Sequence, residues 1–315
     1  MFGQVLKSSK FIAIGVAAAA GTLALSACGS SSAGPSSSEG AGTCPTTPIN
    51  VVATTNVWAN IANQLAGPCA KVTTIIASPT ADPHDFEPDS TTSQAYTDAK
   101  LAIENGLGYD AWSDKIIASL GSSAPQVLDL GTTVGLSVGD NPHIWYSPTY
   151  VQESAAAITS ALKGLRPDGA SSFDQAASEF KTNLGPYLDE VASIKSSYSG
   201  TPIGSTESIF VYMAEATGLN LTTPPQFMTA IANDSDPTSQ SVATFTNQIK
   251  DKQIKVLMYN TQTDGGLPQQ MLTLAQSSGV PVVDITETLT PEGATFQQWQ
   301  LTQLQNLSQT LASGK

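Results

Sequence analysis

Residues 49–76 read INVVATTNVWANIANQLAGPCAKVTTII, and this stretch decides the fold class. Residues 49–54 are apolar and rich in β-branched side chains, which is typical of a strand. An amphipathic helix follows, with apolar residues at helical spacing, and it ends at Gly67-Pro68. Residues 72–76 are again β-branched. A strand, a helix and a second strand in this order indicate a parallel sheet flanked by helices.

The same alternation recurs along the chain in two groups of predicted strands. The strands are expected at residues 49–54, 72–76, 101–104, 126–130, 203–206, 254–259 and 280–284. Between the groups lies a long helical stretch, residues 169–199, in which Gly185-Pro186 should cause a bend. We therefore predict an α/β fold with two β/α lobes, each a parallel-type sheet flanked by helices, bridged by a long, kinked helix.

The chain contains two histidines, His84 and His143. Each follows a proline in a short polar segment, residues 78–88 (SPTADPHDFEP) and 139–146 (GDNPHIWY). Proline restricts its own φ and its neighbour's backbone, so each imidazole is held on a stiff turn. His84 also follows a predicted strand, and ligands bind at the carboxyl ends of strands in such sheets. The pair suggests a shared metal ion, and two unrelated loop histidines are the plain alternative.

Carboxylates from the second half of the chain would have to complete such a site. Four candidates lie near the ends of predicted strands: Glu207, Asp264, Asp284 and Glu287. Any of them taken alone is more commonly a solvated group, and Glu207 could equally be a first-turn residue favoured by a helix dipole. Two imidazoles with two carboxylates suit Mn²⁺, Fe²⁺ or Zn²⁺ and differ from the all-oxygen cage of Ca²⁺.

The N-terminal residues indicate export from the cytoplasm. Two lysines precede an apolar run, residues 11–25, of the length of a signal peptide. The run ends in Leu25-Ser26-Ala27-Cys28, which resembles the lipobox of bacterial lipoproteins, and an ordinary signal peptide with a chance cysteine is the alternative. We predict a signal peptide over 1–27, and a lipidated Cys28 with a flexible Ser/Gly-rich tether over 28–45.

Charge and cysteine content limit the partners and the compartment. The net charge of −13 argues against nucleic acid or an anionic membrane surface as a partner. With Cys28 lipidated, Cys44 and Cys69 remain, and outside the cytoplasm an even pair favours a disulfide. About 270 residues follow the tether, which is enough for one large domain or two medium ones.

Six segments together resemble the metal-binding solute receptors of bacterial zinc and manganese ABC transporters. They are residues 56–58 (NVW), 82–88 (DPHDFEP), 104–112 (ENGLGYDAW), 141–145 (NPHIW), 206–212 (TESIFVY) and 282–289 (VVDITETL). The resemblance spans nearly the whole mature chain. It implies two lobes, at 46–168 and 200–315, joined by a linker helix at 169–199, with the metal between the lobes.

The resemblance also implies a ligand set. The family's ligand positions fall on His84, His143, Glu207 and a carboxylate near the last strand. The family's usual Thr-Asp-Ser-Ile pattern aligns best with Thr286-Glu287-Thr288-Leu289, which makes Glu287 the fourth ligand and Asp284 the alternative. The His-rich loop of many zinc-type members is absent. The ion is then Mn²⁺ or Zn²⁺, with Fe²⁺ as a further candidate, and the His-poor set favours manganese.

The implied function is that of a monomeric extracytoplasmic receptor, tied to the membrane only by its lipid, that hands the metal to an ABC permease and its ATPase subunit. Such a receptor is not an enzyme. A stiff helical linker should limit closure to a small tilt, and acid should favour release. The alternatives are an adhesin or cell-wall interaction lipoprotein with a structural metal, and a zinc hydrolase. Against the hydrolase, the sequence lacks a His-Glu-x-x-His motif and a Gly-x-Ser-x-Gly motif.

Overall fold

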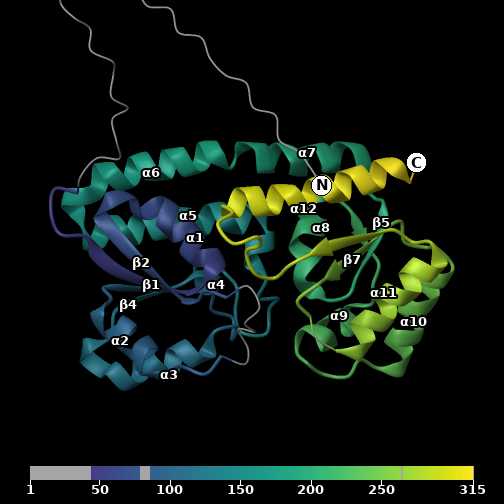
Figure 1. Ribbon diagram of the computed structural model, residues 1–315, viewed down its shortest axis with the longest axis horizontal. Helices are drawn as coiled ribbons and strands as arrows, with labels where there is room; N and C mark the ends of the chain where they lie inside the picture. Colours follow the sequence, from purple (N-terminus) through teal and green to yellow (C-terminus); the bar gives the residue numbers. More distant parts are fainter. Residues whose placement is uncertain (1–43, 79–85, 264, 315) are drawn as a thin grey trace, which may run out of the picture. The chain divides into compact units, whose positions relative to one another are not determined.

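The computed structural model describes residues 44–78, 86–263 and 265–314, which contain two four-stranded parallel sheets (Figure 1). The first sheet has the order β2-β1-β3-β4 and the second has the order β6-β5-β7-β8, so both follow one plan. The strands are β1 (Ile49–Thr55), β2 (Ala70–Ile76), β3 (Leu101–Glu104), β4 (Gln126–Asp129), β5 (Pro202–Ser205), β6 (Asn220–Leu221), β7 (Leu257–Asn260) and β8 (Val282–Ile285). The predicted fold class is confirmed.

Helices cover both sheets. In the first half they are α1 (Asn56–Ala66), α2 (Ser90–Asp98), α3 (Ala111–Leu120), α4 (Leu130–Thr133), α5 (Pro148–Leu165) and α6 (Ala170–Asn183). In the second half they are α7 (Gly185–Tyr198), α8 (Val211–Thr217), α9 (Pro225–Ala232), α10 (Ser239–Lys250), α11 (Gly266–Ser278) and α12 (Phe296–Ser313). Several helices begin with a capping side chain. Ser147 caps α5, and Thr295 caps α12. In the part of the chain that is described, no helix is long and apolar enough to cross a membrane.

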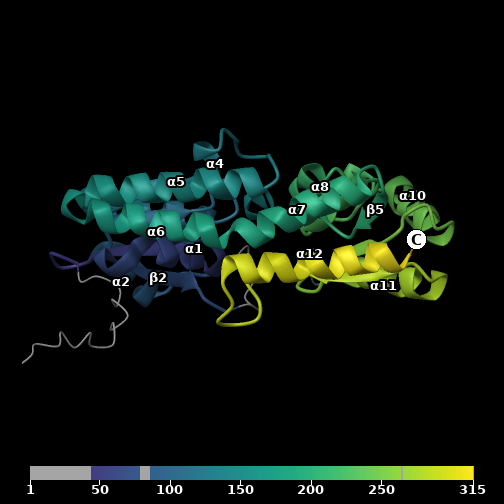
Figure 2. The ribbon, with the colours of Figure 1, turned by 90° about the horizontal axis from the view of Figure 1, so that it is seen from above.

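A bent helix joins the lobes, as predicted. α6 packs against α1 and α5 of the first lobe, and α7 packs against α8 and α12 of the second (Figures 1 and 2). The two helices meet at Leu184, just before Gly185-Pro186. Pro186 has no backbone N–H, so the regular bond to the carbonyl four residues earlier cannot form, and the helix bends there.

The C-terminal half differs in detail from the prediction. β7 begins at Leu257 rather than at residue 254, because pairing with β5 starts at Gly204↔Leu257. β6, α9 and α10 were not predicted. The last helix, α12, lies alongside α7 and runs in the same direction, with Phe296 packed against Tyr187 at the start of both helices, and it also reaches α1 of the first lobe (Figure 2).

One hydrophobic core is continuous through both lobes. It contains side chains from β1 and β3, from α5 and α7, and from β7, β8 and α12. Strand alternation divides each sheet between two faces. Leu101 and Ile103 face this shared core, whereas Ala102 faces a smaller cluster under α2 and α3. In the second sheet, Met258 faces the shared core and Leu257 faces a separate cluster under α10 and α11.

The start of the folded region is tied down covalently. Cys44 and Cys69 form a disulfide with their Cα atoms 4.9 Å apart, as predicted. Arg166, in the turn after α5, donates to the Thr46 hydroxyl and to the Thr47 carbonyl. The signal peptide, Cys28 and most of the tether lie outside the described residues, so these three features and the lobe limits stay predictions.

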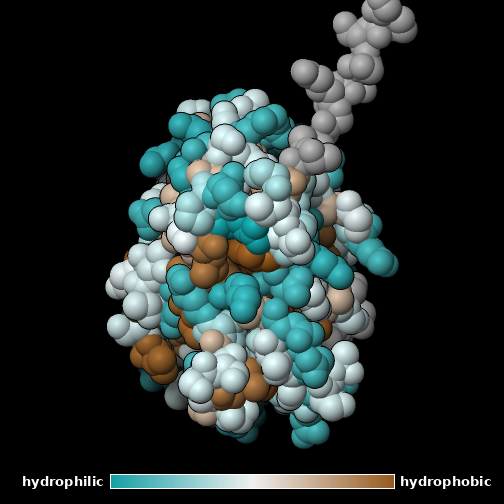
Figure 3. All heavy atoms as spheres, turned by 90° about the vertical axis from the view of Figure 1, so that its left-hand side faces the viewer, coloured by the Kyte–Doolittle hydropathy of each residue, from teal (hydrophilic) through white to brown (hydrophobic). Residues whose placement is uncertain are grey.

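The described surface is mainly polar. Hydrophilic residues cover most of the face shown in Figure 3, and hydrophobic residues form only small separate patches there. Among the described residues, the exposed large hydrophobic side chains are Val127 and Val138. This pattern agrees with the strongly negative net charge of −13.

Glu104, at the carboxyl end of β3, is a buried acid whose hydrogen-bond partner in the described part of the chain is a neutral hydroxyl. Its carboxylate accepts a hydrogen bond from the Ser113 hydroxyl, and the Tyr96 hydroxyl lies 2.5 Å from the Ser113 oxygen. Burial, together with neighbouring carboxylates that include Asp110, raises the pKa of Glu104 to about 8. The folded state therefore binds a proton here that the unfolded chain releases near its ordinary pKa of 4.5.

Glu104→Gln should make stability less dependent on pH. Because the folded pKa is raised, the contribution of neutral Glu104 is complete below pH 4.5 and is lost as pH rises to about 8. Each unit of difference between the folded and unfolded pKa changes the free energy of unfolding by about 1.4 kcal/mol. Urea unfolding of metal-free protein should show the variant gaining on the wild type as pH rises through this window. Parallel stability curves would contradict the raised pKa.

Candidate metal centre

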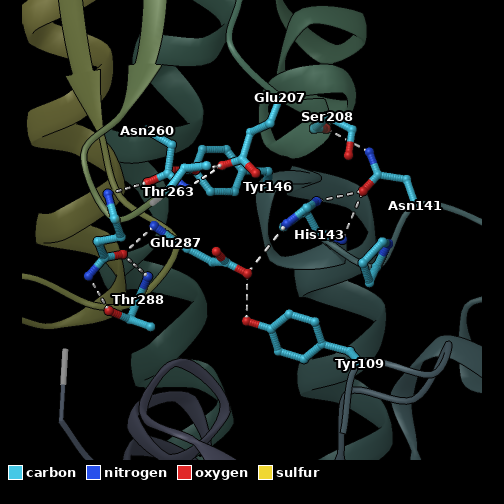
Figure 4. A network of polar contacts seen from close by, with 12 residues as sticks. Tyr109, Asn141, His143, Tyr146, Glu207, Ser208, Asn260, Thr263, Glu287 and Thr288 are labelled. Atoms are coloured by element: carbon cyan, nitrogen blue, oxygen red, sulfur yellow. Dashed lines mark hydrogen bonds and ion pairs between the residues drawn. The ribbon is translucent and has the colours of Figure 1, made fainter. Parts of the chain in front are cut away.

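Three of the four predicted ligands come together where the lobes meet (Figure 4). His143 stands just before a short 3₁₀ helix, Ile144–Tyr146, in the first lobe. Glu207 follows β5 and Glu287 follows β8, so both carboxylates lie at the carboxyl edge of the second sheet. His143 and Glu207 are 2% and 3% exposed. His84 and Asp264 lie outside the described residues.

Glu287 rather than Asp284 faces His143. The Oε1 atom of Glu287 lies 3.5 Å from Nε2 of His143 and accepts a hydrogen bond of 2.9 Å from the Tyr109 hydroxyl. Asp284 is exposed within β8, between the buried Val283 and Ile285. Strand alternation thus turns Asp284 to the side opposite its buried neighbours.

Asn141 orients the imidazole of His143. Its Nδ2 donates to the Ser208 carbonyl at 2.7 Å, which leaves its Oδ1 facing the histidine. That oxygen accepts the backbone N–H of His143 at 3.1 Å and lies 2.7 Å from Nδ1. We therefore assign the proton to Nδ1. The lone pair of Nε2 then points towards Glu287, and a cation would bridge this arrangement.

Glu207 is fixed by two donors and is difficult to ionise. Its Oε1 accepts hydrogen bonds from Nδ2 of Asn260 and, at 3.0 Å, from the Thr263 hydroxyl. Burial, together with the charge of Glu287, raises the pKa of Glu207 to about 7. His143 and the two donors act in the opposite direction. In the metal-free protein, Glu207 therefore keeps its proton to a higher pH than an ordinary glutamate does.

The side-chain amide of Gln262 binds the backbone that carries Glu287. Oε1 of Gln262 accepts the backbone N–H groups of Glu287 at 2.7 Å and of Thr288 at 2.9 Å. Nε2 of the same side chain donates to the Thr288 hydroxyl at 2.6 Å. Because both ends of the amide are engaged, its orientation is fixed.

The first lobe also holds this loop. The Tyr146 hydroxyl donates to the Thr286 carbonyl at 2.7 Å, and Oδ1 of Asn56 accepts the Leu289 N–H at 3.2 Å. Glu287 thus belongs to the second lobe by sequence, but its loop is bonded to both lobes.

The segment after β3 presents Tyr109 to the site. The Asp110 carboxylate accepts the N–H groups of Asn105 at 2.7 Å and Gly106 at 2.9 Å, which closes the loop. Gly106 has φ +75°, and a Cβ there would collide with the Asp129 carboxylate. Nδ2 of Asn105 donates to the Pro142 carbonyl at 3.1 Å, next to His143. The residues that resemble the family motif therefore support the histidine.

Sequence reasoning missed the supporting residues Tyr109, Asn141, Asn260, Gln262 and Thr263. Tyr109 and Asn141 lay in segments already singled out, without a role. Asn260, Gln262 and Thr263 could have been found from their place after a predicted strand. Within residues 44–78, 86–263 and 265–314, no three His, Cys, Asp or Glu side chains form a ready-made metal cage. His143, Glu207 and Glu287 are thus neighbours whose role as ligands is a proposal.

Comparisons with known proteins agree with this chemistry. The family model described as zinc-uptake complex component A, periplasmic, matches residues 51–310. The manganese-binding lipoprotein MntA of Bacillus subtilis (strain 168) is 23% identical over 248 residues, which cover 75% of this chain and 76% of that protein.

Solved structures share the fold. FpvC from Pseudomonas aeruginosa, in complex with Mn²⁺, aligns with a TM-score of 0.71 at 16% identity and covers 85% of this chain and 100% of that one. The Cd-bound periplasmic metal binding protein from Candidatus Liberibacter asiaticus gives a TM-score of 0.70 at 19% identity, covering 84% of this chain and 99% of that one. At these identities the likeness establishes the fold alone.

Metal binding should release a proton from Glu207 in mild acid. Its pKa is raised to about 7, so at about pH 6 the carboxyl is mostly protonated and must lose its proton to bind a cation. Apparent affinity should therefore weaken as pH falls through this pKa. Calorimetry in two buffers of different ionisation enthalpy should show more proton release by the wild type than by Glu207→Gln at about pH 6, and equal release at about pH 8.5. Equal release at both pH values would contradict the raised pKa.

Proposed function

The chain belongs to the family of zinc-uptake complex component A, a metal-binding solute-binding protein, and from this premise we propose that it is an extracytoplasmic, lipid-anchored receptor that delivers Mn²⁺ or Zn²⁺ to an ABC permease. Members of this family are components of an uptake complex and are not enzymes, in agreement with the predicted absence of catalysis.

One observation carries the proposal. An imidazole with a free Nε2 lone pair and two carboxylates, from His143, Glu207 and Glu287, converge from both lobes. Two ionised carboxylates offset the charge of a divalent ion, and the mixed nitrogen and oxygen donors suit a first-row transition metal. His84 is the fourth ligand of the proposal, on the grounds of its sequence motif.

Anchoring and delivery rest on the sequence and on relatives. The Leu25-Ser26-Ala27-Cys28 segment supports lipidation of Cys28, and MntA of Bacillus subtilis is named a lipoprotein. The tether would let the folded region reach a permease in the same membrane, whose ATPase subunit drives import. The metal is cargo, so the site has to release it as well as bind it.

Release calls for only a small structural change. The core shared by the lobes and the α6–α7 helix oppose a wide opening. The raised pKa of Glu207 gives protonation a way to weaken the site without unfolding it. We therefore expect local rearrangement of the ligands to accompany transfer to the permease.

Titration of metal-stripped protein with Mn²⁺ and Zn²⁺ tests the proposal. His143→Ala and Glu287→Gln should each weaken metal binding by roughly 100-fold or more. This exceeds the loss expected for a residue that only hydrogen-bonds to a metal ligand. The matched control is Asp284→Asn, which removes the exposed carboxylate three residues from Glu287 and should bind as the wild type does. Equal effects of Glu287→Gln and Asp284→Asn would contradict the assignment.

The same metal-stripped protein distinguishes a transported metal from a structural metal. A transport receptor should keep its circular dichroism spectrum and cooperative unfolding after the metal is removed. Unfolding of the stripped protein would favour the adhesin alternative. In cells, loss of Cys28 or of His143 should reduce uptake of radiolabelled metal.

A further inference from the structure

We propose that Asn260, at the end of β7, and Thr263, in the loop after it, are positioning residues that withhold Oε1 of Glu207 from the metal, so that the site favours Zn²⁺ over Mn²⁺. The inference rests on the proposed function. It assigns metal selection to two residues that are not themselves ligands.

Among the described residues, the hydrogen bonds that Glu207 accepts fall on one oxygen. Oε1 accepts both from Nδ2 of Asn260 and from the hydroxyl of Thr263. A carboxylate oxygen has about two lone-pair sites, so two donors fill Oε1. Oε2 then remains for a cation, and Glu207 would bind it through a single oxygen.

The first of the two donors is locked in place. Asn260 is fully buried at the end of β7, where it pairs with Ile285 of β8. Its Oδ1 accepts the Gln262 N–H at 3.0 Å, so its Nδ2 is the end that faces Glu207. Glu207 itself is only 3% exposed and has little room to turn its carboxylate. Binding through both oxygens would require breaking these bonds in a buried site.

The same loop holds the other carboxylate. Gln262, between the two donors, binds the backbone N–H groups of Glu287 and Thr288. One oxygen of Glu287 already accepts from Tyr109. The segment 260–263 therefore sets the position of both acidic side chains and limits how many oxygens they offer.

The number of oxygens decides which ion fits better. Zn²⁺ is satisfied by four ligands in a tetrahedron, whereas Mn²⁺ favours octahedral, oxygen-rich sites. Withholding one carboxylate oxygen should therefore weaken the binding of Zn²⁺ only slightly and weaken the binding of Mn²⁺ more. This geometry opposes the preference for manganese that the ligand types alone suggest.

Thr263→Val tests the inference because it removes the hydroxyl at nearly constant volume. The ratio of the Mn²⁺ to the Zn²⁺ dissociation constant should fall by about tenfold, within the range known for outer-shell changes. Thr263→Ser keeps the hydroxyl and should restore the wild-type ratio. Thr273→Val, on an exposed part of α11, is the matched control and should leave the ratio unchanged. Asn260→Ala, which removes the other donor, should shift the ratio in the same direction.

X-ray absorption at the metal edges measures the number of ligands on the ion. A purely structural role of Thr263 would leave this number unchanged. Mn²⁺ bound to Thr263→Val should have an additional oxygen ligand relative to the wild type. An unchanged ratio in both variants, or equal weakening for both metals, would overturn the inference and leave the proposed function standing. A wild-type protein that binds neither metal would overturn both.

Discussion

The burial of Tyr146 between the lobes is the constraint on which the site depends. Its ring packs edge-on against Phe210 and Trp299 of the second lobe, with ring centroids 6.1 Å apart in each pair. Its hydroxyl donates to the Thr286 carbonyl at 2.7 Å and lies 3.1 Å from Oε1 of Gln303. Burial raises the pKa of this phenol well above its usual value, so it stays a neutral donor. Because Tyr146 lies three residues after His143 and touches the residue before Glu287, it fixes the distance between those two side chains.

The polar support of the site uses neutral groups. Asn141 orients His143, Gln262 holds the backbone of Glu287, and Asn260 with Thr263 holds Glu207. Amides and hydroxyls align these side chains without adding charge, which matters where the buried Glu207 and the half-buried Glu287 already repel each other. The metal-free site reduces this repulsion by keeping Glu207 partly protonated. A divalent ion would take the place of that proton, which couples affinity to pH.

The sequence predicted what local patterns encode. β-Branched runs located the strands of the first lobe, and Gly185-Pro186 located the bend between α6 and α7. β6 has two residues and no periodicity to detect, and the path of α12 along α7 depends on contacts between distant segments. The family pattern already favoured Glu287 over Asp284, and the structure adds that Asp284 is exposed within β8 whereas Glu287, in the loop after β8, faces His143. Asn260 and Gln262 were missed because amide side chains match no metal-ligand pattern, and only their place directly after a predicted strand could have pointed to them.

The central claim is that one divalent metal binds between the lobes through His143, Glu207 and Glu287, with His84 as the fourth ligand. The most direct test is a crystal structure of the metal-loaded protein with anomalous scattering recorded at the manganese and zinc edges. The account predicts one anomalous peak at the lobe junction, about 2.0–2.2 Å from Nε2 of His143 and from a carboxylate oxygen of each glutamate. A peak at Asp284, or a junction site that lacks either glutamate, would contradict it.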